Sequence, residues 1–130
     1  MASPKHILVV DDDPTITRLT QLNLEREGYT VDTAQNGAEA LDRLRQRSYA
    51  MVITDATMPE VDGFQLVEQI RKNPRTVGLP VLMLTAKTEI EDITRGYETG
   101  TDLYLTKPCK PEQLLAHVRR ALGEPTSGGE

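Results

Sequence analysis

The sequence has few of the features that mark secreted or membrane-bound proteins. It contains one cysteine, Cys109, so no internal disulfide can form, which fits a reducing compartment. No apolar run approaches the roughly 20 residues that a membrane-spanning helix needs. The opening residues MASPKH have no apolar signal-peptide core. We therefore expect a cytoplasmic protein with no membrane partner.

Positive charge is also scarce. The chain has 15 Lys and Arg against 20 Asp and Glu, a net charge of -5. An acidic protein gains little from counterion release on nucleic acids, so direct nucleic-acid binding is not expected. A glycine-rich phosphate loop is lacking too, because the first apolar run is followed by the acidic turn DDDP. The sequence therefore gives no indication of a flavin or nucleotide site.

Short apolar runs alternate with segments of helical periodicity along the chain. Runs rich in branched residues predict strands at 7–10, 31–34, 50–54, 81–85 and 103–106. Apolar residues at helical spacing predict five helices. The marker residues of these helices are Ile16, Leu19 and Leu22; Ala40, Leu41 and Leu44; Leu66, Val67 and Ile70; Ile90, Ile93 and Tyr97; and Leu115, Val118 and Leu122.

This alternation predicts an α/β fold, a doubly wound five-stranded parallel sheet with helices on both faces. A chain of 130 residues has the length of one ordinary domain. We place that domain at residues 5–123. The segment EPTSGGE at 124–130 has no apolar anchor, so we expect a flexible tail or the start of a truncated linker.

Chemically reactive residue types follow four of the predicted strands. Asp11, Asp12 and Asp13 follow the first strand, Asp55 follows the third, Thr85 ends the fourth and Lys107 follows the fifth. Ligands of such sheets bind beyond the carboxyl ends of the strands. Adjacent carboxylates repel one another, so a cation is expected close by. Mg²⁺ takes one or two carboxylates together with water and phosphate oxygens, and the set suits phosphoryl transfer.

Four motifs in order make the chain resemble a receiver domain of a two-component response regulator. They are VVDD at 9–12, DATMPEVDG at 55–63, LTA at 84–86 and TKP at 106–108. The resemblance extends from Lys5 to Leu122. It implies the flavodoxin-like strand order 2-1-3-4-5 of the chemotaxis receiver. It also implies a regulatory phosphoacceptor, which catalyses only its own phosphorylation and its slow dephosphorylation.

The resemblance also implies roles for individual residues. Asp55 would accept the phosphoryl group, and Lys107 would pair first with that carboxylate and then with the phosphoryl group. The implied direct Mg²⁺ ligands are Asp12, Asp55 and the backbone carbonyl of Thr57, and Asp11 would assist through water. The other implied phosphoryl-binding and switch residues are Thr85, Ala86 and Tyr104, with a cis peptide bond between Lys107 and Pro108. Thr57 and Lys87 occupy positions that tune the rate of dephosphorylation.

The partners implied by the resemblance are a donor and an output. The donor would be a sensor histidine kinase or a histidine phosphotransfer protein. Phosphorylation would change the face formed by the fourth helix, fifth strand and fifth helix, and so control a downstream protein or an attached effector domain. A phosphorylation-dependent homodimer is a further expectation. Cys109 stands where the family commonly has phenylalanine, so the last loop should pack less tightly.

Two alternatives compete with this interpretation. The stretch ILVVDDDPT also fits the first motif of haloacid dehalogenase-type phosphatases, with Asp11 as nucleophile and Asp13 as general acid. That family needs a further acidic strand end after the lysine, and the chain offers only Glu112 and the tail. Because Asp13 precedes Pro14 at a predicted helix start, we assign it to capping.

The other alternative is a pseudo-receiver, a domain that binds partners without being phosphorylated. The presence of Asp12, Asp55, Thr85 and Lys107 argues against it.

Overall fold

A computed structural model describes residues 5–124, so the predicted tail beyond Glu124 lies outside the described residues. Five strands form one parallel sheet in the order β2-β1-β3-β4-β5. The strands are β1 (His6–Val10), β2 (Thr30–Ala34), β3 (Met51–Thr54), β4 (Val81–Thr85) and β5 (Leu103–Thr106). The helices are α1 (Pro14–Glu25), α2 (Gly37–Gln46), α3 (Gly63–Lys72), α4 (Ile90–Thr99) and α5 (Pro111–Ala121). The doubly wound prediction is confirmed.

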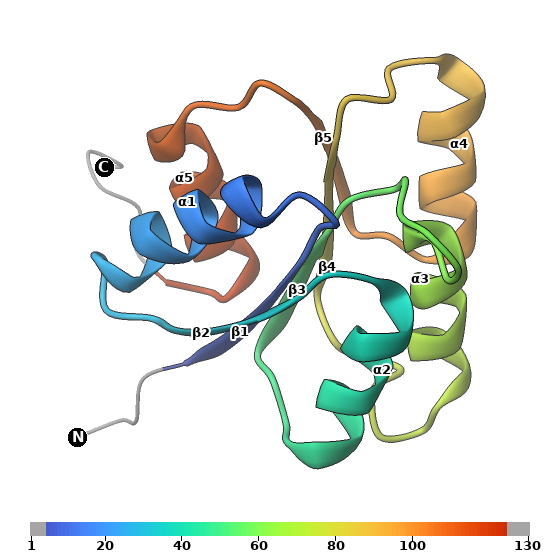
Figure 1. Ribbon diagram of the computed structural model, residues 1–130, viewed down its shortest axis with the longest axis horizontal. Coiled ribbons are helices and arrows are strands. Elements are labelled where there is room, and N and C mark those ends of the chain that lie inside the picture. Colours follow the sequence, from blue (N-terminus) through green and yellow to red (C-terminus); the bar gives the residue numbers. More distant parts are fainter. Residues whose placement is uncertain (1–4, 125–130) are drawn as a thin grey trace.

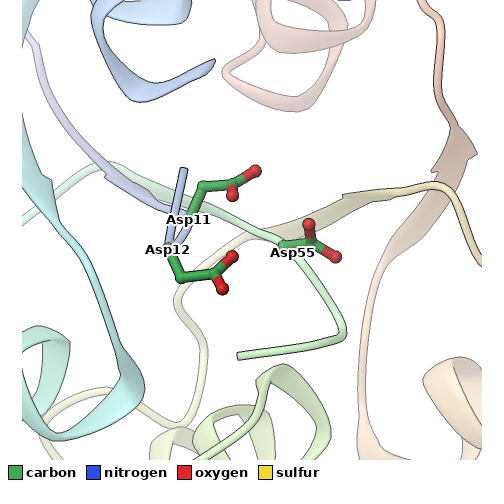
Figure 2. A group of neighbouring side chains, drawn as sticks. All are labelled: Asp11, Asp12 and Asp55. Carbon is green, nitrogen blue, oxygen red and sulfur yellow. The ribbon is translucent and has the colours of Figure 1, made fainter. Parts of the chain in front are cut away.

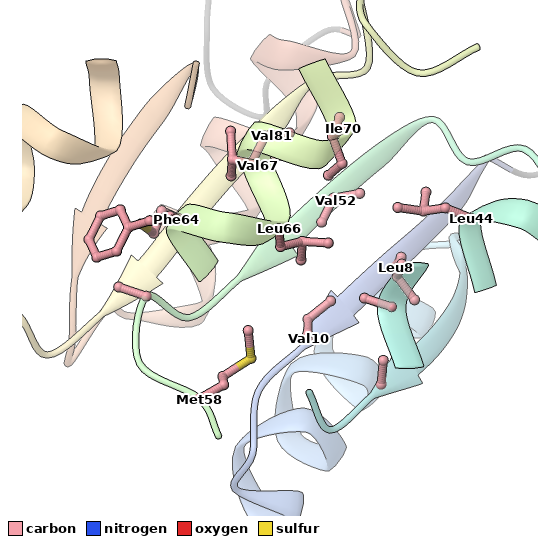
Figure 3. Packing of buried hydrophobic residues seen from close by; sticks show 14 of the residues in the cluster. Leu8, Val10, Leu44, Val52, Met58, Phe64, Leu66, Val67, Ile70 and Val81 are labelled. Atoms are coloured by element: carbon pink, nitrogen blue, oxygen red, sulfur yellow. The ribbon is translucent and has the colours of Figure 1, made fainter. Parts of the chain in front are cut away.

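The sheet separates two hydrophobic layers. Helices α1 and α5 cover one face, and α2, α3 and α4 cover the other (Figure 1). Strand β1 supplies both layers because successive side chains of a strand point to opposite faces. Ile7 and Val9 pack toward α1 and α5, whereas Leu8 and Val10 pack toward α2 and α3, as Figure 3 shows for the second pair. The central strands are therefore buried on both sides.

Helix α1 buries a different face from the one that its leucines predict. Leu19 is 54% exposed and Leu22 is 40% exposed. The buried residues are Thr17, Thr20 and Leu24. Thr17 can be buried because its hydroxyl donates to the Pro14 carbonyl at 3.1 Å. Helical spacing correctly identified the helix, and α1 is left with an apolar outer surface.

Polar side chains cap the starts of α1 and α2, and the sequence predicted the cap at Asp13. Asp13 caps α1 and its carboxylate accepts from the Thr15 N–H at 2.9 Å. Asn36 caps α2 by accepting from the Glu39 N–H at 2.8 Å. These side chains satisfy N–H groups that the first turn of a helix leaves free. Within the described residues, no helix is both long enough and apolar enough to cross a membrane.

Residue Glu124, the last that the structure describes, is tied to the domain. Its backbone N–H donates to the Arg119 carbonyl at 2.8 Å. Its carboxylate accepts from the Tyr29 hydroxyl and lies 3.3 Å from the Lys5 ammonium. This contact joins the end of α5 to the start of β1.

Candidate functional site

Three carboxylates meet at the carboxyl ends of the two central strands. Strands β1 and β3 are neighbours and pair Val10 with Thr54, so the residues that follow them lie side by side. Asp11 and Asp12 follow β1, and Asp55 follows β3. One carboxylate oxygen from each lies within 4.8 Å of the others (Figure 2). Oxygen donors at this spacing suit a small hard cation.

Lys107 supplies the positive charge that such a cluster requires. Its Nζ atom donates to Asp11 Oδ2 at 2.7 Å and to Asp55 Oδ2 at 3.0 Å. The side chains of Asp11 and Asp55 are only 5% and 11% exposed, so both ion pairs are shielded from water. The peptide bond between Lys107 and Pro108 is cis.

The two buried carboxyl groups have different proton affinities. Burial would raise the pKa of Asp55, but hydrogen bonds from Thr85, Lys107 and the Thr57 backbone outweigh it and lower that pKa. Burial raises the pKa of Asp11, and the contact with Lys107 only partly offsets this rise. Asp55 is therefore the buried carboxylate that the site keeps most firmly ionised, which is the form a nucleophile needs.

The loop after Asp55 folds back over its own carboxylate. The Thr57 N–H donates to Asp55 Oδ1 at 3.1 Å. The Gly63 N–H donates to the Ala56 carbonyl at 2.9 Å. A side chain at Gly63 would overlap the Asp55 carbonyl, so only glycine permits this closure. The sequence analysis included Gly63 only as part of the motif DATMPEVDG and missed its role in closing this loop. The available signal was a glycine at the start of a predicted helix.

The hydroxyl of Thr85 is buried at the end of β4. The Lys87 N–H donates to that hydroxyl at 3.3 Å. The Lys87 carbonyl in turn accepts from the Tyr104 hydroxyl at 2.8 Å, and Tyr104 is 8% exposed. Ala86 lies exposed between the two linked residues. These bonds form a continuous path from the site to β5.

Of the two aspartates that follow Asp11, one belongs to the carboxylate cluster and the other does not. Asp12 is exposed at the rim of the cluster. Asp13 is not part of the cluster, because its carboxylate caps α1. Cys109 is half-buried against the layer formed by α1 and α5, and burial raises the pKa of its thiol. A protonated, packed thiol is typical of a structural cysteine.

The fold and the site together define a sheet-edge acidic site with a lysine counter-ion, of the kind used for phosphoryl chemistry. The sequence matches the family described as "Response regulator receiver domain" over residues 7–119. The chain therefore belongs to this family of phosphoacceptor switches in two-component signalling. The receiver interpretation is confirmed over the phosphatase alternative.

Individual relatives agree with this assignment. The chain is 42% identical over 116 residues to RpaA of Synechocystis, named as a DNA-binding dual master transcriptional regulator, covering 89% of this chain and 48% of RpaA. It is 43% identical over 123 residues to the Synechocystis response regulator Rre1, covering 94% of this chain and 53% of Rre1. The chain thus spans about half the length of these curated relatives.

A solved structure supports the same fold. The Vibrio cholerae chemotaxis protein CheY4 superposes with a TM-score of 0.86 at 34% sequence identity. The match covers 91% of this chain and 98% of CheY4. The strand order expected from the resemblance is confirmed.

Proposed function

We propose that Asp55 is the phosphoacceptor of this receiver. The observation that carries the proposal is the bridge from Lys107 to Asp55 and Asp11, which keeps a shielded carboxylate ionised at the end of a central strand. The donor would be a phosphohistidine of a sensor kinase or phosphotransfer protein. An Asp55 oxygen would form a bond to phosphorus as the phosphorus–nitrogen bond breaks. The electron pair of that bond would return to the imidazole.

Mg²⁺ fits the donor set of this site. The carboxylates of Asp11, Asp12 and Asp55 would hold it, together with the backbone carbonyl of Thr57. When bound, Mg²⁺ neutralises charge between the carboxylates and the incoming phosphoryl oxygens.

The basic and hydroxyl groups would then hold the product. Lys107 would move its contact from Asp55 to a phosphoryl oxygen, and Thr85 would donate its hydroxyl to another, with the Ala86 backbone beside it. Hydrolysis of the acyl phosphate would return Asp55 to its free form. Thr57 and Lys87 flank this position and would set the access of water, so slow self-dephosphorylation is part of the proposal.

The conformational output would follow the path from Thr85 through Lys87 to Tyr104. This path ends on the face formed by α4, β5 and α5. Ile90 and Tyr97 are 79% and 46% exposed on that face and are available for a partner. Phosphorylation would shift the population of two arrangements of this face.

The donor would dock on the opposite layer. A groove of about 550 Å³ lies between α1 and the segment that leads into α5. Leu19, Leu84 and Pro108 line it, and Lys107 joins it to the carboxylate cluster. Because this apolar groove is continuous with the phosphorylation site, its occupant would be the donor protein that carries the phosphohistidine. A cytoplasmic location is part of the same proposal, since response regulators receive their phosphoryl group from kinases in the cytoplasm.

The output partner would be a downstream protein or an effector domain attached to the receiver. RpaA, which this chain matches over about half of its length, is a DNA-binding regulator by name. An attached effector domain of that kind would bind DNA, whereas the receiver domain itself would not. A homodimer formed on phosphorylation through the α4, β5 and α5 face would be one route to such an output.

Intact-protein mass after incubation with acetyl phosphate and Mg²⁺ tests the proposal. Wild type should gain a labile phosphate, and Asp55→Asn or a chelator should abolish it. Asp13→Asn is a matched control, because asparagine preserves the cap and Asp13 lies outside the carboxylate cluster. A phosphate adduct on Asp55→Asn would overturn the assignment, and no adduct on wild type would indicate a pseudo-receiver.

A further inference from the structure

Helix α4 has fewer fully buried residues than any of the other four helices. The N-cap residue Glu89, which precedes the helix, makes no side-chain capping bond, and Gly96 is the one fully buried residue of α4. Its sequence IEDITRGYET contains four β-branched residues and an internal glycine. Both features lower helix propensity, glycine by about 1 kcal/mol relative to alanine. The chain therefore keeps a costly residue at the position where α4 meets the sheet.

The backbone of Gly96 lies directly against the ring of Tyr104. A Cβ atom at position 96 would lie 2.7 Å from Tyr104 Cδ2 and 3.0 Å from Cε2. Carbon atoms in contact normally stay about 3.5–4.0 Å apart. An alanine would therefore require either α4 or the tyrosine ring to move. We expect the ring to move, because a side chain can turn toward solvent without displacing a whole helix.

The inward ring connects three segments of the chain. Its hydroxyl donates to the Lys87 carbonyl at 2.8 Å, which fixes the loop after β4. Lys87 also donates its N–H to the Thr85 hydroxyl at 3.3 Å. A ring displaced outward would lose the bond to Lys87. The contact between β5 and the loop after Thr85 therefore requires the space that Gly96 leaves free.

A second bond depends on the same close approach. Strand β5 is the edge of the sheet, with β4 as its one neighbouring strand. The outward N–H of Tyr104 donates to the Tyr97 hydroxyl at 3.1 Å. Tyr97 is the residue after Gly96, so a helix displaced by a side chain at 96 would also carry Tyr97 away from this N–H. An edge N–H would then lose its protein acceptor.

We propose that Gly96 is a positioning residue that sets the inward state of Tyr104 and couples α4 to the phosphorylation site. The absence of a side chain at 96 lets the ring of Tyr104 reach Lys87 and lets Tyr97 reach the backbone of β5. Helix α4, strand β5 and the loop after Thr85 then move together. The coupling to phosphorylation rests on the proposed function of Asp55, whereas the positioning of Tyr104 does not.

The test compares Gly96→Ala with Gly78→Ala in the full chain. Gly78 is a matched control, because a Cβ atom there meets nothing within 4 Å and its backbone lies outside the left-handed region. NMR of tyrosine ring carbons, assigned with Tyr104→Phe, should show the Tyr104 signals moved toward those of an exposed tyrosine in Gly96→Ala only. Acetyl phosphate should still phosphorylate Gly96→Ala to the wild-type level. The shifts of α4 amides on phosphorylation should shrink.

A second comparison separates steric exclusion from general loss of folding. In a Tyr104→Ala background the ring is gone, so Gly96→Ala should raise the melting temperature as alanine favours the helix. In wild type the same change should lower it. Unchanged Tyr104 ring signals in Gly96→Ala, or an equal loss of melting temperature in both backgrounds, would overturn the proposal. Both measurements use unphosphorylated protein, so failure of wild type to be phosphorylated would count against Asp55 alone.

Discussion

The ammonium of Lys107 lies 3.0 Å from the Asp55 carboxylate and also 2.7 Å from that of Asp11. One cation therefore pairs with two carboxylates that come from different strands. Burial would lower the pKa of Lys107, but hydrogen bonds to Asp11 and Asp55 raise it above its usual value. The lysine therefore keeps its charge to a higher pH than an ordinary lysine does.

Replacement of Lys107 should show how much the carboxylates destabilise the fold when they have no cation beside them. Lys107→Met leaves shielded carboxylates without their cation, so we expect the free energy of unfolding to fall by about 1–3 kcal/mol, less than for a fully buried pair. Asp11→Asn in the same protein should recover part of this loss. Urea denaturation of Lys107→Met, of Asp11→Asn alone and of the double variant measures both effects. An additive loss in the double variant would contradict the ion-pair interpretation.

Lys107 should also separate phosphorylation from its conformational output. In Lys107→Ala, Asp55 keeps its carboxylate, so acetyl phosphate with Mg²⁺ should still produce a phosphate adduct. The contact that reports the new phosphoryl group is missing, so amide shifts in α4 and β5 should change far less than in phosphorylated wild type. Mass and NMR on the same sample make the comparison. A full set of α4 shifts in the variant would exclude this role of Lys107.

Replacement of an exposed apolar residue of α1 should slow phosphoryl transfer from the donor protein only. Leu19→Asp puts a charge into the groove beside Lys107, so phosphoryl transfer from a histidine kinase that phosphorylates wild type should slow by about tenfold or more. Phosphorylation by acetyl phosphate should not change. Val77→Asp is the matched control, since Val77 is 53% exposed and lies outside the groove. Equal kinase rates for both variants would remove α1 from the docking surface.

Tyr29 should give the domain an alkaline limit of stability. Burial and the neighbouring Glu124 raise the pKa of Tyr29 from 10.0 to about 12. The unfolded chain releases this proton first, so the free energy of unfolding should fall as pH rises from 10 toward 12. Below pH 10 this contribution is fully present. Denaturant titrations of wild type and Tyr29→Phe should diverge in pH dependence across this window, and parallel curves would contradict the assigned cause.

Arg71 should stabilise the amino ends of β4 and β5, at the end of the sheet opposite the site. Its guanidinium donates to the carbonyls of Leu79 and Gly100 and to the Asp102 carboxylate. Arg71→Ala removes donors from these acceptors, so unfolding should become easier by about 2 kcal/mol. The exposed Arg75 offers a control, and Arg75→Ala should change stability by less than about 0.5 kcal/mol. Thermal and urea denaturation of both variants provide the comparison.

The sequence predicted those parts of the site that depend on topology. Asp11 and Asp55 come together because parallel strands end at the same edge of a sheet, and strand position can be read from branched apolar runs. The face of α1 could not be predicted in this way. Leu19 and Leu22 stay exposed while Thr17 is buried, because a local hydrogen bond makes a buried threonine acceptable.

The importance of Gly96 was equally hidden from the sequence. A glycine inside a predicted helix lowers helix propensity, and the pattern gives no reason for it. The reason lies in the ring of Tyr104, which sits on a different element and touches the glycine only in the folded chain. Long-range packing of this kind has no periodic signal.

The division of the molecule into two layers has a consequence for the timing of a signal. The groove beside α1 and the surface of α4 belong to opposite faces of the sheet, while the site lies at the edge that both share. A donor seated in the groove, as proposed, would lie against α5 but would leave the surface of α4 uncovered. An output partner that contacts α4 alone would therefore not compete with the donor for the same residues.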